Sequence, residues 1–130
     1  MIVDSSALLA ILLREAEAAK FSDAIARAGD PKMSAASYIE VALKVDRFSD
    51  TPYDELDRTL TALGITLVPV TVAHARIARE AFNRFGRAPA KLNFGDCLVY
   101  ALAQTSALPL LFKGNAFTHT DIIPAMPVGV

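Results

Sequence analysis

The sequence predicts a three-layer α/β/α domain, and three features lead to this prediction. Apolar runs of four or five residues, typical of buried strands, alternate with longer segments whose apolar residues have helical spacing. This alternation is typical of parallel strands joined by right-handed crossovers, with helices covering both faces of the sheet. The length of 130 residues fits one domain over residues 1–130, and an apolar fraction of 53% is enough to build its core.

The first half of the chain contains two expected strands and four expected helices. Ser5 or Ser6 is expected to cap the first helix, Gly29 to end the second, and Pro52 to occupy the first turn of the fourth. In chain order we expect a strand over 1–4, helices over 5–13 and 15–28, a strand over 31–34, and helices over 35–48 and 52–64.

The second half repeats the pattern with two helices and three short strands. Gly86 ends the first of these helices, and Asn93 is a good cap for the second. In chain order we expect a strand over 65–68, a helix over 71–85, a loop over 87–92, a helix over 93–107, a strand over 108–112, a turn over 113–115 and a last short strand over 122–123.

Composition narrows the classes of protein that remain. No apolar run approaches the roughly 20 residues that span a bilayer, so we expect no membrane segment. The one cysteine, Cys97, excludes an internal disulfide and suits a reducing, cytoplasmic environment, where it is expected to serve packing. A mean hydropathy of +0.36 indicates both that much of the chain is buried and that some apolar surface is reserved for another protein. The apolar helix over 7–13 is the candidate for that surface. The face with Tyr38, Val41 and Phe48 is assigned to the core.

Charge is distributed unevenly, although the net charge is only −1. Residues 61–130 hold 3 acids and 6 bases, and five of these bases form a basic strip opposed only by Glu80. A solvated helix face explains the strip best on charge alone, and a phosphate-binding strip is the alternative. The strip consists of Arg76, Arg79, Arg84, Arg87 and Lys91.

Three acids from remote parts of the sequence fall near the predicted carboxyl edge of the sheet. Asp4 ends the first strand, Glu40 lies in the helix after the second, and Asp96 lies in the first turn of the helix before the fourth. Open α/β sheets bind ligands at that edge. Clustered carboxylates repel unless a cation neutralises them, and Mg²⁺ or Mn²⁺ prefers oxygen ligands. Two such ions about 4 Å apart activate a water in phosphodiester cleavage.

Each acid also has a purely structural explanation. Asp4 is able to cap the first helix, and Asp96 sits where the dipole of a helix capped by Asn93 favours negative charge. Glu40 matches a capping box with Ser37. Spacing alone leaves these alternatives open.

The segments around the acids resemble those of the PIN-domain ribonucleases, and more closely the VapC-type toxin of a bacterial type II toxin–antitoxin (VapBC) pair. The resemblance extends from residue 1 to about 123, with the segments in the family's order and spacing. The matching segments are MIVDSSAL at 1–8, SAASYIE at 34–40, LNFGDCL at 92–98 and LLFKGNAFTHTD at 110–121.

The resemblance implies a Mg²⁺- or Mn²⁺-dependent endoribonuclease that cuts structured RNA, typically transfer RNA. It further implies a cognate antitoxin that covers the active-site groove, and a toxin homodimer or a toxin–antitoxin hetero-oligomer. By this resemblance, the metal ligands and catalytic acids are Asp4, Glu40 and Asp96. Ser6 is then an accessory contact to a metal-bound water or a phosphate. With this family, the basic strip is better interpreted as an RNA-binding surface.

One position departs from the family pattern. Ala116 stands where the family usually has an aspartate, and alanine binds no cation, so we expect severely reduced activity. Asp121 is the nearest remaining acid, and it is better explained as a surface turn residue than as a replacement. An engineered inactivating change and a naturally degenerate toxin both account for Ala116.

Two other classes of protein remain as alternatives. A non-catalytic PIN-fold binding module gains weight from Ala116. A receiver-type, Mg²⁺-binding signalling domain fits the length, but the strand at 65–68 ends in Pro69-Val70 and not in a phospho-accepting aspartate.

Overall fold

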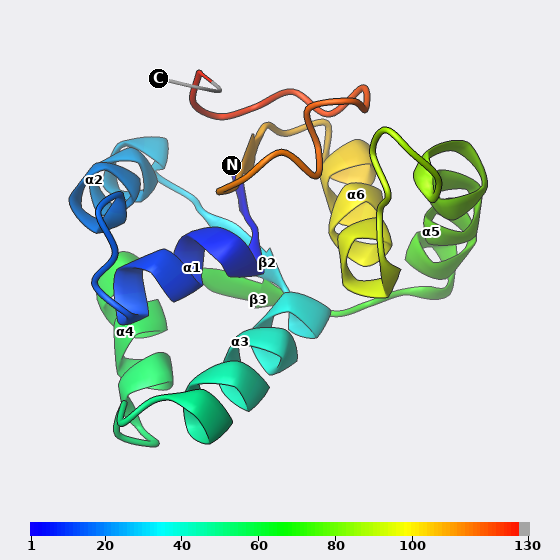
Figure 1. Cartoon of the computed structure of the whole chain (residues 1–130). Helices are drawn as coiled ribbons and strands as arrows, with labels where there is room; N and C mark the ends of the chain where they lie inside the picture. The colour runs from blue at the N-terminus through cyan, green and yellow to red at the C-terminus, as the bar shows by residue number, and fades with distance from the viewer. Residues whose placement is uncertain (128–130) are drawn as a thin grey trace.

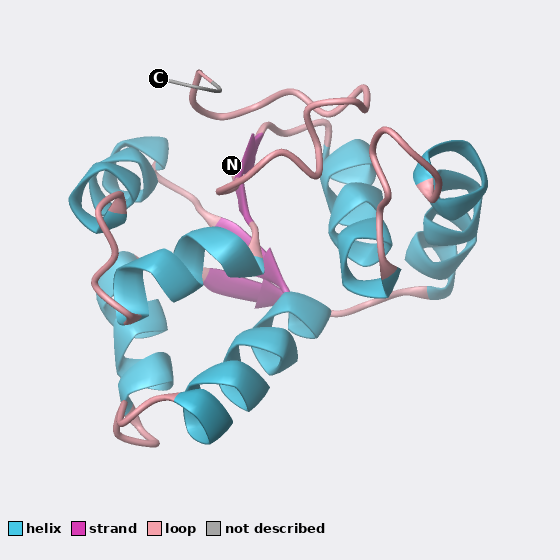
Figure 2. Ribbon diagram, viewed as in Figure 1, coloured by secondary structure: helices cyan, strands magenta, loops and turns pink. Residues whose placement is uncertain are grey.

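The computed structural model describes residues 1–127, which form a parallel four-stranded sheet between helices (Figures 1 and 2). The strand order is β3-β2-β1-β4, and every strand pair is parallel. The elements in chain order are β1 (Ile2–Val3), α1 (Ser5–Leu12), α2 (Ala18–Ala28), β2 (Lys32–Ser34), α3 (Ala35–Phe48), α4 (Glu55–Leu63), β3 (Thr66–Val68), α5 (Val72–Phe85), α6 (Phe94–Ser106) and β4 (Leu110–Leu111).

Strands β1 and β4 are buried on both faces. Ile2 pairs with Leu110, and Val3 pairs with Leu111. Ile2 and Leu110 pack into one core cluster, whereas Val3 and Leu111 pack into the other, because successive strand side chains point to opposite faces. Two short apolar strands therefore supply both cores, and the predicted three-layer α/β/α architecture is confirmed.

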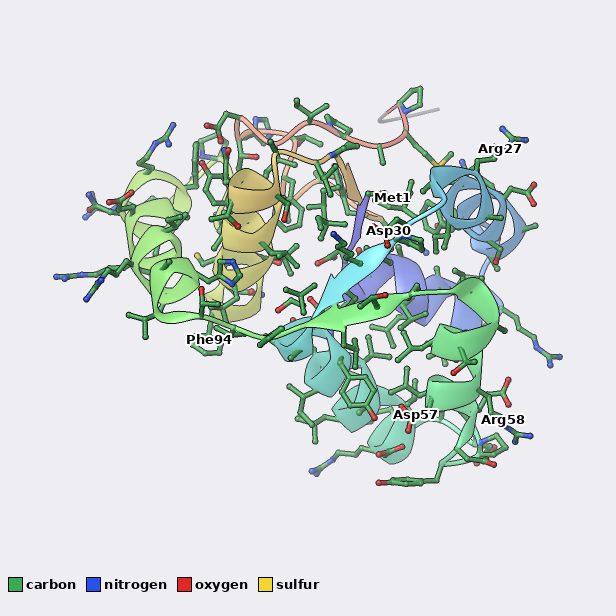
Figure 3. The ribbon with its side chains drawn as sticks, turned by 180° about the vertical axis from the view of Figure 1, so that it is seen from behind. Met1, Arg27, Asp30, Asp57, Arg58 and Phe94 are labelled. Atoms are coloured by element: carbon green, nitrogen blue, oxygen red, sulfur yellow. The ribbon has the colours of Figure 1, made fainter. Side chains whose placement is uncertain are left out.

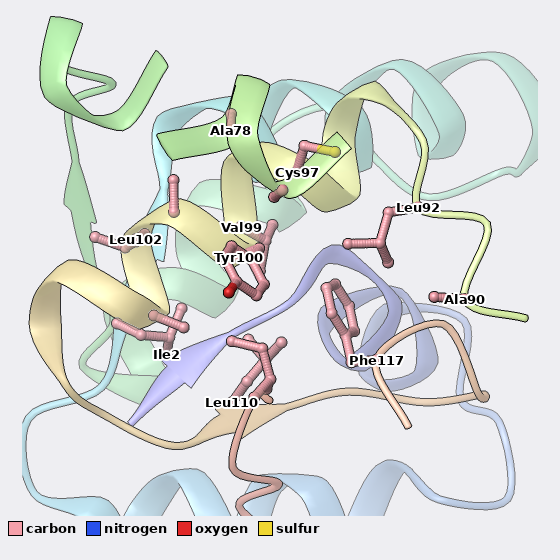
Figure 4. Packing of buried hydrophobic residues seen from close by; sticks show 14 residues of the cluster. Ile2, Ala78, Ala90, Leu92, Cys97, Val99, Tyr100, Leu102, Leu110 and Phe117 are labelled. Carbon is pink, nitrogen blue, oxygen red and sulfur yellow. The ribbon is translucent and has the colours of Figure 1, made fainter. Parts of the chain in front are cut away.

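The helices divide between the two faces of the sheet. Helices α1 to α4 cover the face that carries Val3 and Met33, and α5 and α6 cover the other (Figure 1). On the second face, Phe117 from the segment after β4 packs among Leu92, Leu110 and residues of α6 (Figure 4). This packing holds the chain after β4 against the sheet.

One predicted cap and one predicted helix start are wrong. The cap of α1 is Asp4, the alternative that the sequence also offered, and not Ser5 or Ser6, because the Asp4 carboxylate accepts a hydrogen bond from the Ser6 amide. Helix α4 begins at Glu55 and not at Pro52, since the carbonyl of Pro52 accepts from the Glu55 amide in a turn before the helix. The prediction for residues 35–48 is confirmed at both ends.

The strand predicted at 122–123 is wrong for the part of the chain that the structure describes. The segment pairs with β4 through one bridge, Leu110 to Pro124, and two hydrogen bonds flank it. Leu110 donates to the Ile123 carbonyl at 2.9 Å, and Ala125 donates to the Leu110 carbonyl at 2.8 Å. This single bridge does not make the segment a strand of the sheet.

Several apolar side chains remain on the surface. Phe48 is 77% exposed, so its assignment to the core is wrong, whereas Val41 is buried as predicted. Leu13, at the end of the apolar helix over 7–13, is 45% exposed. Within residues 1–127, none of the helices has the length and apolar character required to cross a bilayer.

Candidate active site

The three predicted acids belong to three elements that meet at the carboxyl edge of the sheet. Asp4 follows β1, Glu40 lies in α3 directly after β2, and Asp96 lies in the first turn of α6. Helices α3 and α6 are in contact, and Figure 1 shows their first turns near the end of β1. Other acids, such as Asp30 and Asp57, lie on separate elements away from the start of α6, which Phe94 marks in Figure 3.

Asp4 is buried, with 5% of its surface exposed, and its carboxylate is held by Ser6. The Oδ2 atom accepts from the Ser6 amide at 3.1 Å and from the Ser6 hydroxyl at 2.5 Å. The same hydroxyl accepts from the Lys113 amide at 2.9 Å. The capping explanation of Asp4 is therefore confirmed, and Ser6 additionally connects Asp4 to the loop that carries Ala116.

Asp96 is half-buried in the first turn of α6. Its Oδ2 atom accepts from the Asn93 amide at 3.0 Å, and the Asn93 side chain accepts from the Asp96 amide at 2.9 Å. This reciprocal capping box confirms the structural explanation of Asp96. A carboxylate accepts several hydrogen bonds or ligand contacts, so the cap does not exclude a second role.

The capping box predicted for Glu40 is wrong. Ser34 caps α3, because its hydroxyl accepts from the Ala36 amide at 3.1 Å, and Ser37 lies inside the first turn. Within residues 1–127, no hydrogen bond or salt bridge reaches the Glu40 carboxylate, and the buried Ser37 hydroxyl also has no partner. Glu40 is half-buried and points at α6, where its carboxylate lies against Gly95. Helix capping therefore does not explain Glu40.

The electrostatics show that the acids act on one another. Burial raises the pKa of Asp4, the hydrogen bonds from Ser6 lower it, and the charge of Asp96 raises it. Burial also raises the pKa of Glu40, and Asp4 and Asp96 raise it further, while Lys44 opposes this. Burial raises the pKa of Asp96 as well, against the effects of Asn93 and Lys44. Three carboxyl groups thus share a region that disfavours their charge.

The three carboxyl groups have the chemistry that binds a divalent cation, although their side chains lie too far apart to bind one jointly as they stand. Within residues 1–127, no three His, Cys, Asp or Glu side chains lie close enough to hold a metal ion as they stand. Mutual repulsion keeps unneutralised carboxylates apart, and two of these three are engaged in helix caps. The oxygen donors are those that Mg²⁺ and Mn²⁺ prefer, and no basic side chain forms a salt bridge with Asp4, Glu40 or Asp96 in the described chain.

Ala116 and Asp121 lie in the chain after β4. Ala116 is partly buried and packs against the cluster beneath α5 and α6. Asp121 accepts from the Tyr100 hydroxyl at 2.7 Å and lies 3.7 Å from the Arg84 guanidinium. The two partners of Asp121 therefore belong to α5 and α6, and they anchor the segment after β4 to these helices.

The five residues of the basic strip are all exposed, but they differ in their surroundings. Arg76 and Arg79 line a surface hollow on α5 together with Phe82. The first turn of α5 lies beside the last turn of α6, because the His74 ring is 3.1 Å from the Thr105 hydroxyl. Further along α5, Arg79 also lines a second hollow together with Phe94 and Cys97 of α6. Arg84 lies near the far end of α5, where it contacts Tyr100 and Asp121. Arg79 consequently lies beside the first turn of α6, which carries Asp96.

Comparison with known proteins decides the family. The PIN domain family matches residues 1–123. Ribonuclease VapC28 of Mycobacterium tuberculosis is 46% identical over 130 residues, which covers 97% of this chain and 98% of that protein. The chain belongs to the PIN domain family, in its VapC ribonuclease branch.

Two solved structures have folds similar to that of this chain. The structure described as a toxin–antitoxin complex from Klebsiella pneumoniae has a TM-score of 0.70 at 17% identity and covers 98% of each chain. Mycobacterium tuberculosis VapC20, described as a sarcin–ricin loop cleaving toxin, has a TM-score of 0.70 at 14% identity and covers 97% of this chain and 98% of that one. The PIN fold is therefore confirmed, and the receiver-type alternative is wrong.

The structure adds contacts to this PIN domain that sequence reasoning missed. The Ser6 hydroxyl bridges Asp4 and Lys113, which are remote in sequence. Gly95 supports the position of Glu40 from another helix. A glycine inside a helix is a signal of close packing, and it could have drawn attention to Gly95. No comparable local signal marks the contact between Ser6 and Lys113.

Proposed function

We propose that this chain is the toxin of a toxin–antitoxin pair and a divalent-metal-dependent endoribonuclease, with Asp4, Glu40 and Asp96 as the metal ligands. The observation that carries the proposal is the meeting of three carboxyl groups at the carboxyl edge of a parallel sheet. Burial raises the pKa of each group, the charges of Asp4 and Asp96 raise that of Glu40, the charge of Asp96 raises that of Asp4, and none of the three forms a salt bridge in the described chain. The ribonuclease name of the 46% identical relative supports the reaction class.

Each residue of this site is proposed to have a separate role. When bound, the Mg²⁺ or Mn²⁺ ion supplies the Lewis acidity that activates water and stabilises the leaving oxygen of a phosphodiester. Ser6 holds the Asp4 carboxylate through its amide and its hydroxyl, and the Asn93 amide holds Asp96. Glu40 brings the third carboxylate from α3, and Ser6 also keeps the loop after β4 beside Asp4. The acids are thereby presented from the starts of α1 and α6 and from the second turn of α3.

The substrate proposed is structured RNA, such as transfer RNA. Its phosphates are proposed to contact the basic strip, because phosphate contacts supply most of the affinity for nucleic acids. Arg76 and Arg79 are exposed beside Phe82, which offers an aromatic surface to a base. Arg87 and Lys91 extend this surface along the loop to α6, and Arg84 contributes least since it already contacts Tyr100 and Asp121.

The partner proposed is an antitoxin that covers the active-site groove, with toxin homodimers or toxin–antitoxin hetero-oligomers forming in the cytoplasm. The toxin–antitoxin complex among the related folds supports this partner. Exposed apolar side chains at the end of α1 and on α3 offer surface for such contacts, including Leu13, Leu43 and Phe48.

Ala116 is proposed to weaken the activity, because the loop after β4 then contributes no carboxylate. The test is to restore Ala116→Asp and to measure Mn²⁺-dependent cleavage of structured RNA. We expect a gain of at least about 100-fold, as for other groups that act on transition-state charge. A folded Ala116→Asp protein without any gain would show that position 116 is not part of the site.

A non-catalytic PIN-fold binding module is the second candidate, and Ala116 is the observation that favours it. Mn²⁺ titration followed by thermal unfolding separates the two, since a ligand that binds only the folded state stabilises it. A nuclease site predicts a rising unfolding temperature that is lost on mutating Asp4 or Asp96. A binding module predicts no response in the parent protein.

A further inference from the structure

Gly95 occupies an unusual position for a glycine. It is buried in the first turn of α6, directly before Asp96. Glycine disfavours a helix because it loses more conformational freedom on folding than other residues. Its φ angle is not among the positive values of this chain, so the backbone does not require glycine at this position.

The space around Gly95 explains the residue. A Cβ atom added there would lie 2.5 and 2.6 Å from the two Glu40 carboxylate oxygens and 2.7 Å from their carbon. These separations are shorter than side-chain atoms tolerate. All three nearest atoms belong to the end of one flexible side chain and not to the backbone. An alanine would therefore be accommodated by moving the Glu40 carboxylate away from α6.

We infer that Gly95 is a positioning residue for Glu40: its missing side chain lets the carboxylate from α3 reach the first turn of α6, beside Asp96. The inference rests on the proposed metal-binding function. Glu40 has no hydrogen bond or salt bridge in the described chain that would hold it there otherwise. The space at Gly95 therefore controls how closely two acids from different helices approach each other.

The test is a double-mutant cycle on Mn²⁺ affinity, measured by titration calorimetry with the intact protein. Gly95→Ala should weaken Mn²⁺ binding by about 10–100-fold, the usual effect of changing a residue that positions a metal ligand. Glu40→Ala should weaken it at least as much. In the Glu40→Ala background, Gly95→Ala should have no further effect, because the side chain that it displaces is gone.

Thermal unfolding without metal provides the control for folding. In the Glu40→Ala background, Gly95→Ala should raise the unfolding temperature by about 2–4 °C, because alanine favours the helix and no longer meets a carboxylate. With Glu40 present, the rise should be smaller or absent. The loss of Mn²⁺ affinity in Gly95→Ala is then assigned to the displaced ligand and not to unfolding.

The outcomes separate this inference from the proposed function. If the parent binds Mn²⁺ and Gly95→Ala binds it equally well, the role of Gly95 is overturned while the metal site stands. If Gly95→Ala weakens binding equally with and without Glu40, Gly95 does not act through Glu40, and the inference is again overturned. If the parent itself binds no Mn²⁺, the metal site fails, and the positioning role fails with it.

Discussion

At the scale of single residues, Asp4 combines a structural and a chemical role in one carboxyl group. It caps α1 through the Ser6 amide, and a cap of this kind satisfies an amide hydrogen that the helix leaves unpaired. It is also buried, which raises its pKa, so the ionised form is kept at a cost in free energy. A helix cap on the surface would avoid that cost, and this favours a second role for the group.

Replacing Asp4 with asparagine separates the two roles. Asparagine caps helices as well as aspartate does, so the metal-free free energy of unfolding of Asp4→Asn at pH 7.5 should stay within about 1 kcal/mol of the parent or exceed it. Its stabilisation by Mn²⁺ should disappear. Urea unfolding with and without Mn²⁺ measures both effects.

Asp4→Ala is the matched control, because it removes the cap as well as the charge. It should be less stable than Asp4→Asn by about 0.5–2 kcal/mol in metal-free buffer. An Asp4→Asn protein that Mn²⁺ still stabilises as strongly as the parent would exclude Asp4 as a ligand.

At the scale of elements, the chain after β4 is attached to α6 by the Tyr100 hydroxyl. This hydroxyl donates to Asp121 at 2.7 Å and accepts from the Gln104 amide at 2.9 Å. The ring packs against Phe85 with 5.7 Å between ring centroids. Since Tyr100 is buried, its hydroxyl links α6 to the segment that also contains Phe117 and Ala116.

Tyr100→Phe should therefore destabilise the protein although the ring packing is kept. The change removes a hydrogen bond from a buried hydroxyl to the charged carboxylate of Asp121, and we expect a loss of about 1–2 kcal/mol in the free energy of unfolding. Urea unfolding measures it. Tyr38→Phe is the matched control, because the Tyr38 hydroxyl donates to Asp57 at 2.8 Å on the surface and should contribute less than about 1 kcal/mol. Equal losses in the two variants would show that the Tyr100 contacts do not anchor this segment.

At the scale of the whole molecule, folding brings three negative groups together that are far apart in the unfolded chain. Their folded pKa values lie above the ordinary values of 3.8 for aspartate and 4.5 for glutamate. Between the ordinary and the raised values, the folded state binds more protons than the unfolded state. The contribution of these groups to stability is therefore present at low pH and is lost as the pH rises through the raised values.

This sign gives a prediction for the dependence of stability on pH. In metal-free buffer the contribution of the three acids should fall from about pH 4 upward. Mn²⁺ should oppose this fall, so the stabilisation by Mn²⁺ should be larger at pH 7.5 than at pH 5.5. Urea unfolding over this range with EDTA or Mn²⁺ measures both trends.

Asp4→Asn provides the comparison for the pH series, because other groups also titrate. The exposed pair of Glu17 and Lys113 lowers the pKa of Glu17 and contributes with the opposite sign, although exposure keeps that effect small. Without metal, Asp4→Asn should lose less stability than the parent as the pH rises. A parent that gains stability relative to Asp4→Asn over the same range would contradict the raised pKa of Asp4.

The sequence by itself determined the class of fold, the family, the order of the elements and two of the three helix caps next to the acids. These follow from signals that act within a few residues: the Asn93 cap lies three residues before Asp96, and the Asp4 carboxylate reaches the amide two residues on. The boundaries of α3 were predictable for the same reason, whereas the start of α4 was not, because Pro52 fits a turn as well as a first helical turn.

Only the tertiary structure decided how the acids are held relative to one another. Glu40 makes no capping box, and its carboxylate lies against Gly95 on another helix. The Ser6 hydroxyl joins Asp4 to Lys113, which lies 107 residues after Ser6, and Asp121 is held by Tyr100 of α6. Such contacts depend on how whole helices pack on the sheet, and the free energy of that packing is distributed over both core clusters. The residue types show which chemistry is available, and the packing determines which groups meet.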